Sequence, residues 1–192
     1  MSSQVLSESP RRGLNSRQAE TVERLLAAGM DELRAVGHEA LTVRTVAQRA
    51  GVSPATAYTY LASKNHLYAE LFWRHVTLDV PAPRPARDET DRVRAEVRAL
   101  ARQIAKEPAL AAAVTPALLG SDPDVDRLRL RIGAEFVRRF QRALGDSADP
   151  DVVDTLVLAF SGALLQAGMG LMTYDEMTDR LDAVVAVIMR GN

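Results

Sequence analysis

Two histidine–carboxylate pairs have the spacing of metal ligands. His66 with Glu70, and His75 with Asp79, stand four residues apart, so each pair would lie on one side of a helix. Each pair supplies only half of a site, and no third ligand stands at a motif spacing. The chain also has no cysteine, no phosphate-binding glycine loop and no nucleophile elbow. We therefore predict no metal, no cofactor and no enzyme, and keep an all-α enzyme as a third hypothesis.

A second set of side chains could recognise DNA. Residues 42–64, TVRTVAQRAGVSPATAYTYLASK, have the pattern of two short helices joined by a glycine turn and followed by a third helix start. One face of the second helix carries no carboxylate, so it could enter a major groove without charge repulsion. Thr42, Arg44 and Lys64 should contact phosphates, and Arg44 could also reach a base. The predicted reading surface comprises Ser53, Pro54, Ala55, Thr56, Tyr58, Thr59 and Tyr60.

Capping residues predict where these helices begin. Thr42 would cap a helix over residues 43–50, Gly51 would supply the turn, and Ser53 would cap the second helix. A helical hairpin inside an ordinary all-α core is the alternative for the turn alone. Apolar residues would face each other across the pair of helices: Val46, Ala47, Ala50, Val52, Ala57 and Tyr60.

A longer set of residues in this region matches a known family. The set is Thr42, Val43, Arg44, Val46, Ala47, Ala50, Gly51, Val52, Ser53, Thr56, Tyr58, Tyr60, Ser63, Lys64 and Leu67. With these residues the chain resembles, over residues 16–75, the DNA-binding domain of the tetracycline-repressor (TetR) family of bacterial transcription regulators. That family usually has Gly where Ala55 stands and Phe where Leu61 stands. Because Ala55 lies on the predicted reading face, the operator sequence transfers less readily than the fold.

The resemblance implies an all-α protein with a three-helix DNA-binding bundle and a second helical domain. We place a flexible arm at residues 1–14, the DNA-binding domain at 15–62, and a ligand-binding and dimerisation domain at 63–192. The implied function is a homodimeric repressor that a small, largely hydrophobic effector releases from DNA. Arg11 and Arg12 in the arm could reach a minor groove, although a tail without contacts fits equally.

Two longer helices flank the predicted helix pair: the first would brace it and complete a three-helix bundle, and the second would touch both domains. The first would follow Asn15 and end at Gly37. Ser63 would cap a second helix that reaches about Val80, and the segment 81–87, PAPRPAR, would stop it. In the family this second helix transmits ligand-driven movement, and the resemblance implies the same here.

Helical periodicity continues beyond that segment, and we expect about nine helices in all. Pro108 and Gly120 bound one helix, and Pro123 opens another, whose inward positions are Val125, Leu128, Ile132, Phe136, Phe140 and Leu144. The six arginines between 127 and 142 on that helix should mostly form a solvated stripe.

The last two helices, after Pro150 and after Thr173, are apolar on more than one face. Such helices must be covered on most sides, and this chain has few other elements to do so. We therefore predict a two-fold dimer with a four-helix interface, in which Gly162, Gly168 and Gly170 permit close helix approach. Two reading helices about 34–36 Å apart would then require a roughly palindromic operator. The alternative is that these helices form the core of a monomer.

An effector pocket could form among apolar residues of the second domain. The candidate lining residues are Leu71, Phe72, Val76, Leu110, Val114, Leu118, Leu119, Phe136, Phe140, Phe160 and Met169. The competing hypothesis is a ligand-binding or interaction module of the same fold that does not bind DNA.

Composition is compatible with both hypotheses. The net charge is −1, with +2 on residues 1–75 and −3 on the remainder, so any basic surface must be local. Hydrophobic residues make up 47% of the chain, which is ample for a core. We expect no apolar run long enough to span a bilayer and no signal peptide, and hence a cytoplasmic protein.

Overall fold

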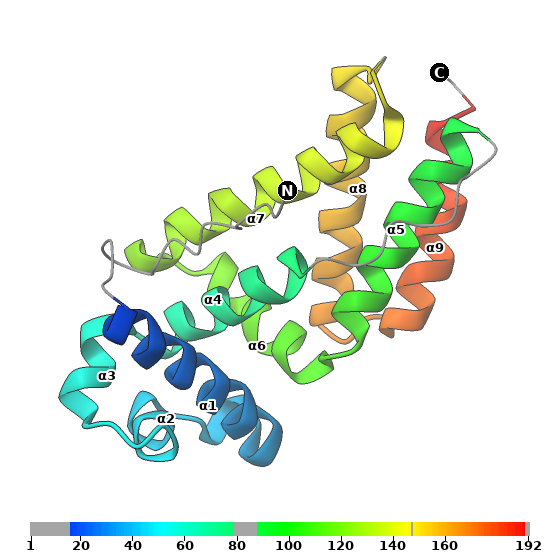
Figure 1. Ribbon diagram of the computed structural model, residues 1–192. Coiled ribbons are helices and arrows are strands. Elements are labelled where there is room, and N and C mark those ends of the chain that lie inside the picture. Colours follow the sequence, from blue (N-terminus) through cyan, green and yellow to red (C-terminus); the bar gives the residue numbers. More distant parts are fainter. Residues whose placement is uncertain (1–15, 79–87, 147, 191–192) are drawn as a thin grey trace.

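The computed structural model describes residues 16–78, 88–146 and 148–190, and these are helical throughout, which confirms the all-α prediction (Figure 1). The first three helices form a cluster at one end of the molecule. They carry the apolar residues predicted to face each other and the predicted reading surface. The helices are α1 (Ser16–Ala40), α2 (Val43–Arg49), α3 (Pro54–Tyr60), α4 (Lys64–Thr77), α5 (Glu89–Ala105), α6 (Pro108–Leu119), α7 (Pro123–Leu144), α8 (Pro150–Gly168) and α9 (Tyr174–Ile188).

Helix α1 braces the α2–α3 pair through an apolar stripe that includes the fully buried Leu25 and Leu33. Gly37 interrupts the helix with φ 75° and ψ 171°, a conformation that favours glycine, so regular helix ends there as predicted. The arm and the Asn15 cap lie outside the described residues.

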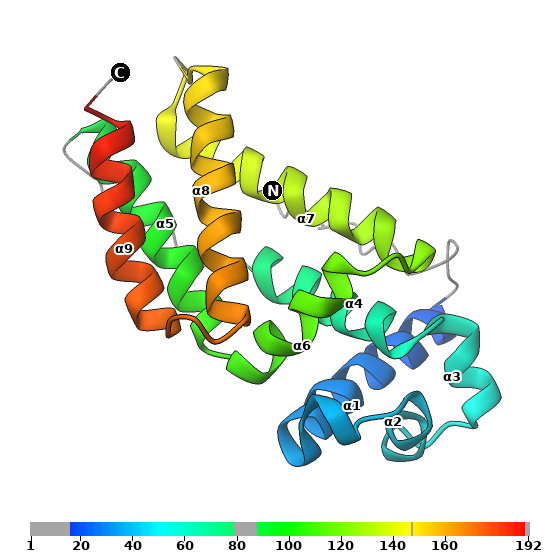
Figure 2. The same cartoon turned by 180° about the vertical axis from the view of Figure 1, so that it is seen from behind.

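Helix α4 leaves this cluster and enters the second domain, which occupies the other end of the molecule (Figures 1 and 2). It ends at Thr77, earlier than the predicted end near Val80. The Thr77 hydroxyl donates to the carbonyls of Trp73 and Arg74, and Leu78 turns to ψ 131°, so the backbone leaves the helix here. Val80 and the predicted linker 81–87 lie outside the described residues.

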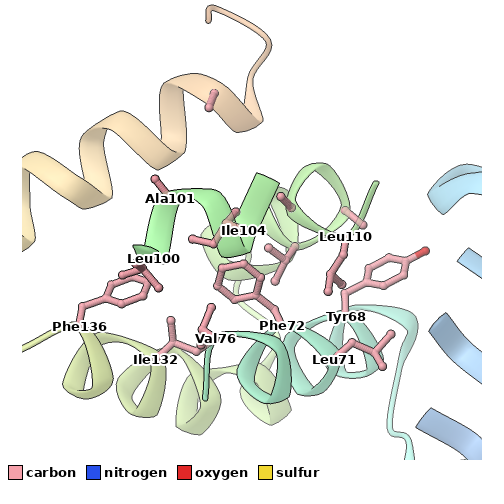
Figure 3. Packing of buried hydrophobic residues seen from close by; sticks show 14 of the residues in the cluster. Tyr68, Leu71, Phe72, Val76, Leu100, Ala101, Ile104, Leu110, Ile132 and Phe136 are labelled. Atoms are coloured by element: carbon pink, nitrogen blue, oxygen red, sulfur yellow. The ribbon is translucent and has the colours of Figure 1, made fainter. Parts of the chain in front are cut away.

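The core of the second domain forms where α4, α5, α6 and α7 meet. Phe72 of α4 is fully buried at its centre, between Leu100 and Ile104 of α5 and Leu110 of α6 (Figure 3). Phe160 of α8 packs edge-on against two phenylalanines of α7. The predicted inward positions of α7 are all buried.

The arginine stripe of α7 is less solvated than predicted. Arg139 is only 8% exposed; its Nε donates to Glu96 Oε1 at 2.6 Å and its Nη1 to the carbonyl of Val76 at 2.9 Å. Arg131 lies 4.5 Å above the ring centre of Trp73, a cation–π contact. The spacing of the arginines could not predict these contacts, because the partner residues belong to other helices.

Helix α8 corrects the expectation about apolar runs. The most apolar 18-residue window of this 19-residue helix has a mean hydropathy of 1.3, enough by length and composition alone to cross a bilayer. In the structure α8 packs against α6, α7 and α9, and only 22% of its most apolar window is buried. Its apolar character therefore reflects a helix with one face in the core and another on the surface.

Of the three glycines predicted at the dimer interface, Gly168 permits a close helix approach inside the chain instead, and the interface role of all three stays a prediction. A Cβ on Gly168 would lie 2.9 Å from Thr115 Cβ, so α6 and α8 can approach this closely only because the side chain is absent. A Cβ on Gly162 or Gly170 would meet no atom within 4 Å. Those two glycines lie at surface positions within the described chain.

Candidate DNA-binding surface

The α2–α3 unit begins with a reciprocal cap. Thr42 Oγ1 accepts the backbone N–H of Thr45 at 3.1 Å, and Thr45 Oγ1 accepts the N–H of Thr42 at 3.2 Å. Gly51, with φ 66°, makes the turn, and the N–H of Val52 donates to the carbonyl of Ala47. The predicted start of α2 and its turn residue are confirmed.

Helix α3 begins at Pro54 after the predicted cap, since Ser53 Oγ accepts the N–H of Thr56 at 3.1 Å. Ala57 is fully buried against the neighbouring helices, which orients α3. The opposite face is open, and Tyr58 is 51% exposed. Of the predicted reading residues, Ser53, Pro54, Ala55, Tyr58 and Thr59 are exposed, and Thr56 and Tyr60 are partly buried.

The basic side chains of α2 differ from one another. Arg44 and Arg49 are both exposed, but Arg49 Nε donates to Glu32 Oε2 at 2.7 Å. That hydrogen bond holds the pKa of the buried Glu32 below its ordinary value. The exposed Gln48 lies one turn after Arg44 on the same side of α2, and the sequence analysis missed it. Its spacing from Arg44 was the available signal.

Lys64 has contacts within the protein that its predicted phosphate role did not anticipate. Its Nζ donates to the carbonyls of His38 at 3.1 Å and Glu39 at 3.4 Å, and the Tyr68 hydroxyl also donates to His38 at 2.8 Å. Burial raises the pKa of Tyr68 to about 12. The ammonium group thus joins α4 to the end of α1.

Both histidines of the candidate metal pairs make contacts within the protein. His66 Nδ1 accepts the N–H of Ala62, and its Nε2 lies 3.7 Å from the buried Glu70. His75 Nε2 and the carbonyl of Gln103 are 2.6 Å apart, while Asp79 lies outside the described residues. Within the described ranges no group of three His, Asp or Glu side chains could hold a metal ion.

The predicted effector-pocket residues mostly belong to one packed core. Leu71, Phe72, Val76, Leu110, Val114, Phe136, Phe140 and Phe160 are buried, and Leu118 is partly buried. Met169 and Leu119 are more than half exposed, so these two do not line an interior pocket. Both stand at the end of a helix, where the periodic pattern no longer determines which side chains face inward.

A cavity of about 300 Å³ lies instead between α8 and α9, on the face predicted to dimerise. Exposed apolar side chains surround it, including Leu158 and Val184, and Val187 lies one turn after Val184. Gly162 and Ala163 form part of its floor, and Arg180 supplies the one charged lining side chain.

Comparison with known proteins agrees with this geometry. The family described as "Bacterial regulatory proteins, tetR family" matches residues 25–71. Over 184 residues the chain is 49% identical to an HTH-type transcriptional regulator of Mycobacterium tuberculosis, spanning 92% of this chain and 84% of that protein. It is 30% identical over 132 residues to the HTH-type transcriptional repressor KstR of Rhodococcus jostii, spanning 68% and 62%. A TetR transcriptional regulator from Rhodococcus sp. RHA1 has the same fold, with a TM-score of 0.75 at 20% identity over 93% and 99% of the two chains.

A capped helix pair with an open, carboxylate-free second helix, in a chain with these relatives, defines a helix-turn-helix transcriptional regulator. The chain belongs to the TetR family. This confirms the resemblance drawn from residues 42–67, and it confirms a regulatory rather than an enzymatic role, because the relatives are DNA-binding regulators of transcription.

Proposed function

We propose that the chain is a homodimeric repressor that binds a roughly palindromic operator and is released by a small, largely hydrophobic effector. The observation that carries the proposal is the exposed face of α3, which presents hydroxyl, aromatic and small groups at one end of the molecule. Neither α2 nor α3 contains a carboxylate. Such a face fits a major groove, where donors, acceptors and methyl groups identify each base pair. Because DNA is its target, the protein would act in the cytoplasm.

Phosphate contacts would position this face on the duplex. Arg44 is exposed at the start of α2, and Thr42 lies beside it. Lys64 uses two of its three N–H donors on backbone carbonyls, so its third can reach a phosphate while the side chain stays in place. Ser53, Pro54, Ala55, Thr56, Tyr58, Thr59 and Tyr60 would provide the base-reading surface, with Gln48 as an added candidate on α2.

Dimerisation would occur through α8 and α9. Leu158 is 74% exposed and Val187 is 62% exposed, and both lie on the long apolar helices beside the cavity of about 300 Å³. A contiguous exposed apolar surface of this kind is typical of a protein–protein interface. A second copy would cover it and hold the two α3 helices at a fixed separation, which is what a palindromic operator requires.

The effector would enter the core where α4, α5, α6 and α7 meet α8. The side chains there are apolar, and Phe160 of α8 lies edge-on to both Phe136 and Phe140 of α7. They fill the space in the structure, so the effector would have to shift them and thereby displace α4. A ligand that prefers the displaced arrangement would shift the population away from the DNA-binding one.

Selection of DNA sequences from a random pool with the full-length chain would test this function. We expect enrichment of an inverted repeat whose half-sites are one helical turn apart. Tyr58→Ala should weaken binding to the enriched sequence without changing the oligomeric state. If no sequence is enriched, or if Arg44, Tyr58 and Lys64 can be replaced without effect, the chain is instead a module of this fold that does not bind DNA.

A further inference from the structure

Several polar contacts join α1 to the second domain, among them those of Lys64 and Tyr68 with the carbonyl of His38 and of Arg74 with Glu23. Two further contacts involve residues that flank α6. Glu107 immediately precedes α6 and accepts two hydrogen bonds from Arg34 of α1, one from Nε at 3.3 Å and a short one from Nη2. Asp122 follows α6 and caps α7; its Oδ2 accepts the Ser63 hydroxyl at 2.6 Å. We call these two contacts the α6 clasps.

Each clasp is connected to the backbone on both sides. Ser63 Oγ also accepts the N–H of His66 at 3.0 Å, so the hydroxyl that contacts Asp122 is the cap of α4. Asp122 Oδ1 accepts the N–H of Asp124 at 3.0 Å, so the carboxylate holds the first turn of α7 at the same time. A displacement of the α6–α7 turn must therefore either pull on the start of α4 or break the 2.6 Å hydrogen bond.

Helix α6 is also fixed from the opposite side. It packs against α1 and α4 on one side and against α8 on the other, where Thr115 fills the place of a side chain on Gly168. Figures 1 and 2 show α6 between the DNA-binding cluster and the α8 end of the molecule. A movement of α8 that displaces α6 would therefore act on both clasps.

We propose that Glu107 and Asp122 are positioning residues for DNA binding. Together, through Arg34 and Ser63, they fix the orientation of the α1–α3 cluster relative to the second domain in the DNA-binding arrangement. Displacement of α6 releases both clasps. This inference rests on the proposed DNA-binding function and identifies the residues through which the second domain would control it.

Two substitutions each disrupt one clasp and leave the helix caps in place. Asp122→Ser keeps a good helix cap on α7 but is too short to reach Ser63. Its matched control is Asp149→Ser, because Asp149 caps α8 in the same Asp-Pro context, with Oδ1 accepting the N–H of Asp151 at 2.8 Å, and contacts no part of the cluster in the described structure. Glu107→Gln removes a charge from a side chain that makes no capping hydrogen bond. Its control is Asp31→Asn, which removes the partner of Arg34 within α1.

The first measurement is the intrachain distance between spin labels on Gln48→Cys of α2 and Gln141→Cys of α7. The chain contains no cysteine, and both positions are exposed. Mixing with excess unlabelled chain makes the distance intramolecular in any oligomeric state. We expect the distance distribution to broaden in Asp122→Ser and Glu107→Gln and to stay unchanged in both controls. Arg34→Gln should broaden it no further when combined with Glu107→Gln.

The second measurement is the affinity of the unlabelled variants for the selected DNA. Release of a clasp should raise the dissociation constant at least about fivefold, the lower end of typical coupling between sites. Unchanged distances and affinity in Glu107→Gln, which alters no cap, would overturn the proposal, and so would tighter DNA binding by either clasp variant. If the wild-type chain selects no DNA, the proposed function fails, while the distance measurement still tests the clasps.

Discussion

Two exposed helical faces at opposite ends of the molecule differ in chemistry. The face of α3 carries hydroxyl groups, Tyr58 and small residues, whereas the face of α8 and α9 is apolar and is hollowed by an open groove of about 300 Å³. Both consist of side chains that a single chain leaves uncovered. The polar face is stable in contact with water. The apolar face is not, because every unit of apolar area that stays hydrated is unfavourable in free energy.

This difference separates two kinds of partner. A reversible DNA contact needs a surface that is stable both free and bound, and α3 has one. A permanent contact is better served by a surface that is unfavourable when free, as Leu158 and Val187 are. Under the proposed function the two faces also depend on each other, because one α3 would fill one groove and the apolar face would bind the second copy.

The largest expected effect comes from a charge on the apolar face. Leu158→Asp should leave the monomer folded, because the side chain is 74% exposed, but should destabilise the dimer by about 3–5 kcal/mol. Sedimentation analysis should show monomers, and operator binding should fall with the loss of the dimer. Leu130→Asp is the control, because Leu130 of α7 is 75% exposed on another element. A dimer that survives Leu158→Asp would contradict the α8–α9 interface.

The next prediction tests the close packing of α6 against α8, which lies between the two faces. Gly168→Ala should destabilise folding by about 1–3 kcal/mol, because its Cβ would collide with Thr115 and force α6 away from α8. Thermal unfolding would measure the change. Gly133→Ala of α7 should instead be neutral or stabilising, because a Cβ there meets no atom within 4 Å and alanine favours helix. Equal effects of the two substitutions would show that the α6–α8 approach is not tight.

Local rules predicted most of the DNA-binding cluster. Thr42, Ser53 and Ser63 each cap the helix that the sequence assigned to them, and Gly37 and Gly51 take positive φ where turns were expected. These features depend on residues within four positions of one another. Local rules therefore predicted the starts of α2, α3 and α4 and the open face of α3.

The remaining features depend on partners far along the chain. Arg139 was expected in water, yet it is buried by Glu96 and a carbonyl of α4. Lys64 was expected to contact a phosphate, yet its Nζ donates to a backbone carbonyl at the end of α1. Periodicity assigns each side chain to a face but cannot say which neighbouring helix provides a charge or a carbonyl there. The clasp residues Glu107 and Asp122 escaped notice for the same reason.

A smaller effect distinguishes the two arginines of α2. Arg44→Gln should weaken operator binding and reduce the slope of log affinity against log salt by about 1, as expected for one lost phosphate contact. Arg49→Gln is the matched control in the same helix, because Arg49 is already paired with Glu32. Affinity titrations over a range of salt concentrations would measure both slopes. A similar loss in the two variants would mean that Arg49 leaves Glu32 on binding.

The smallest effect concerns stability and its dependence on pH. The hydrogen bond from Arg49 holds the pKa of Glu32 below its ordinary value of 4.5 in the folded chain. A carboxyl group with a lowered folded pKa stabilises the protein above its unfolded pKa, and this contribution disappears as the pH falls through the folded value. Arg49→Gln should therefore lower the free energy of unfolding near neutral pH by less than about 1 kcal/mol, because Arg49 is partly exposed.

Denaturant titrations at neutral pH and at a pH well below 4.5, below the lowered folded pKa of Glu32, would measure this difference. The gap between wild type and Arg49→Gln should close on the acid side, since Glu32 is then protonated in both chains. A gap that persists at low pH would show that Arg49 stabilises α2 by packing rather than through the carboxylate. In that case the ion pair with Glu32 would no longer distinguish Arg49 from Arg44.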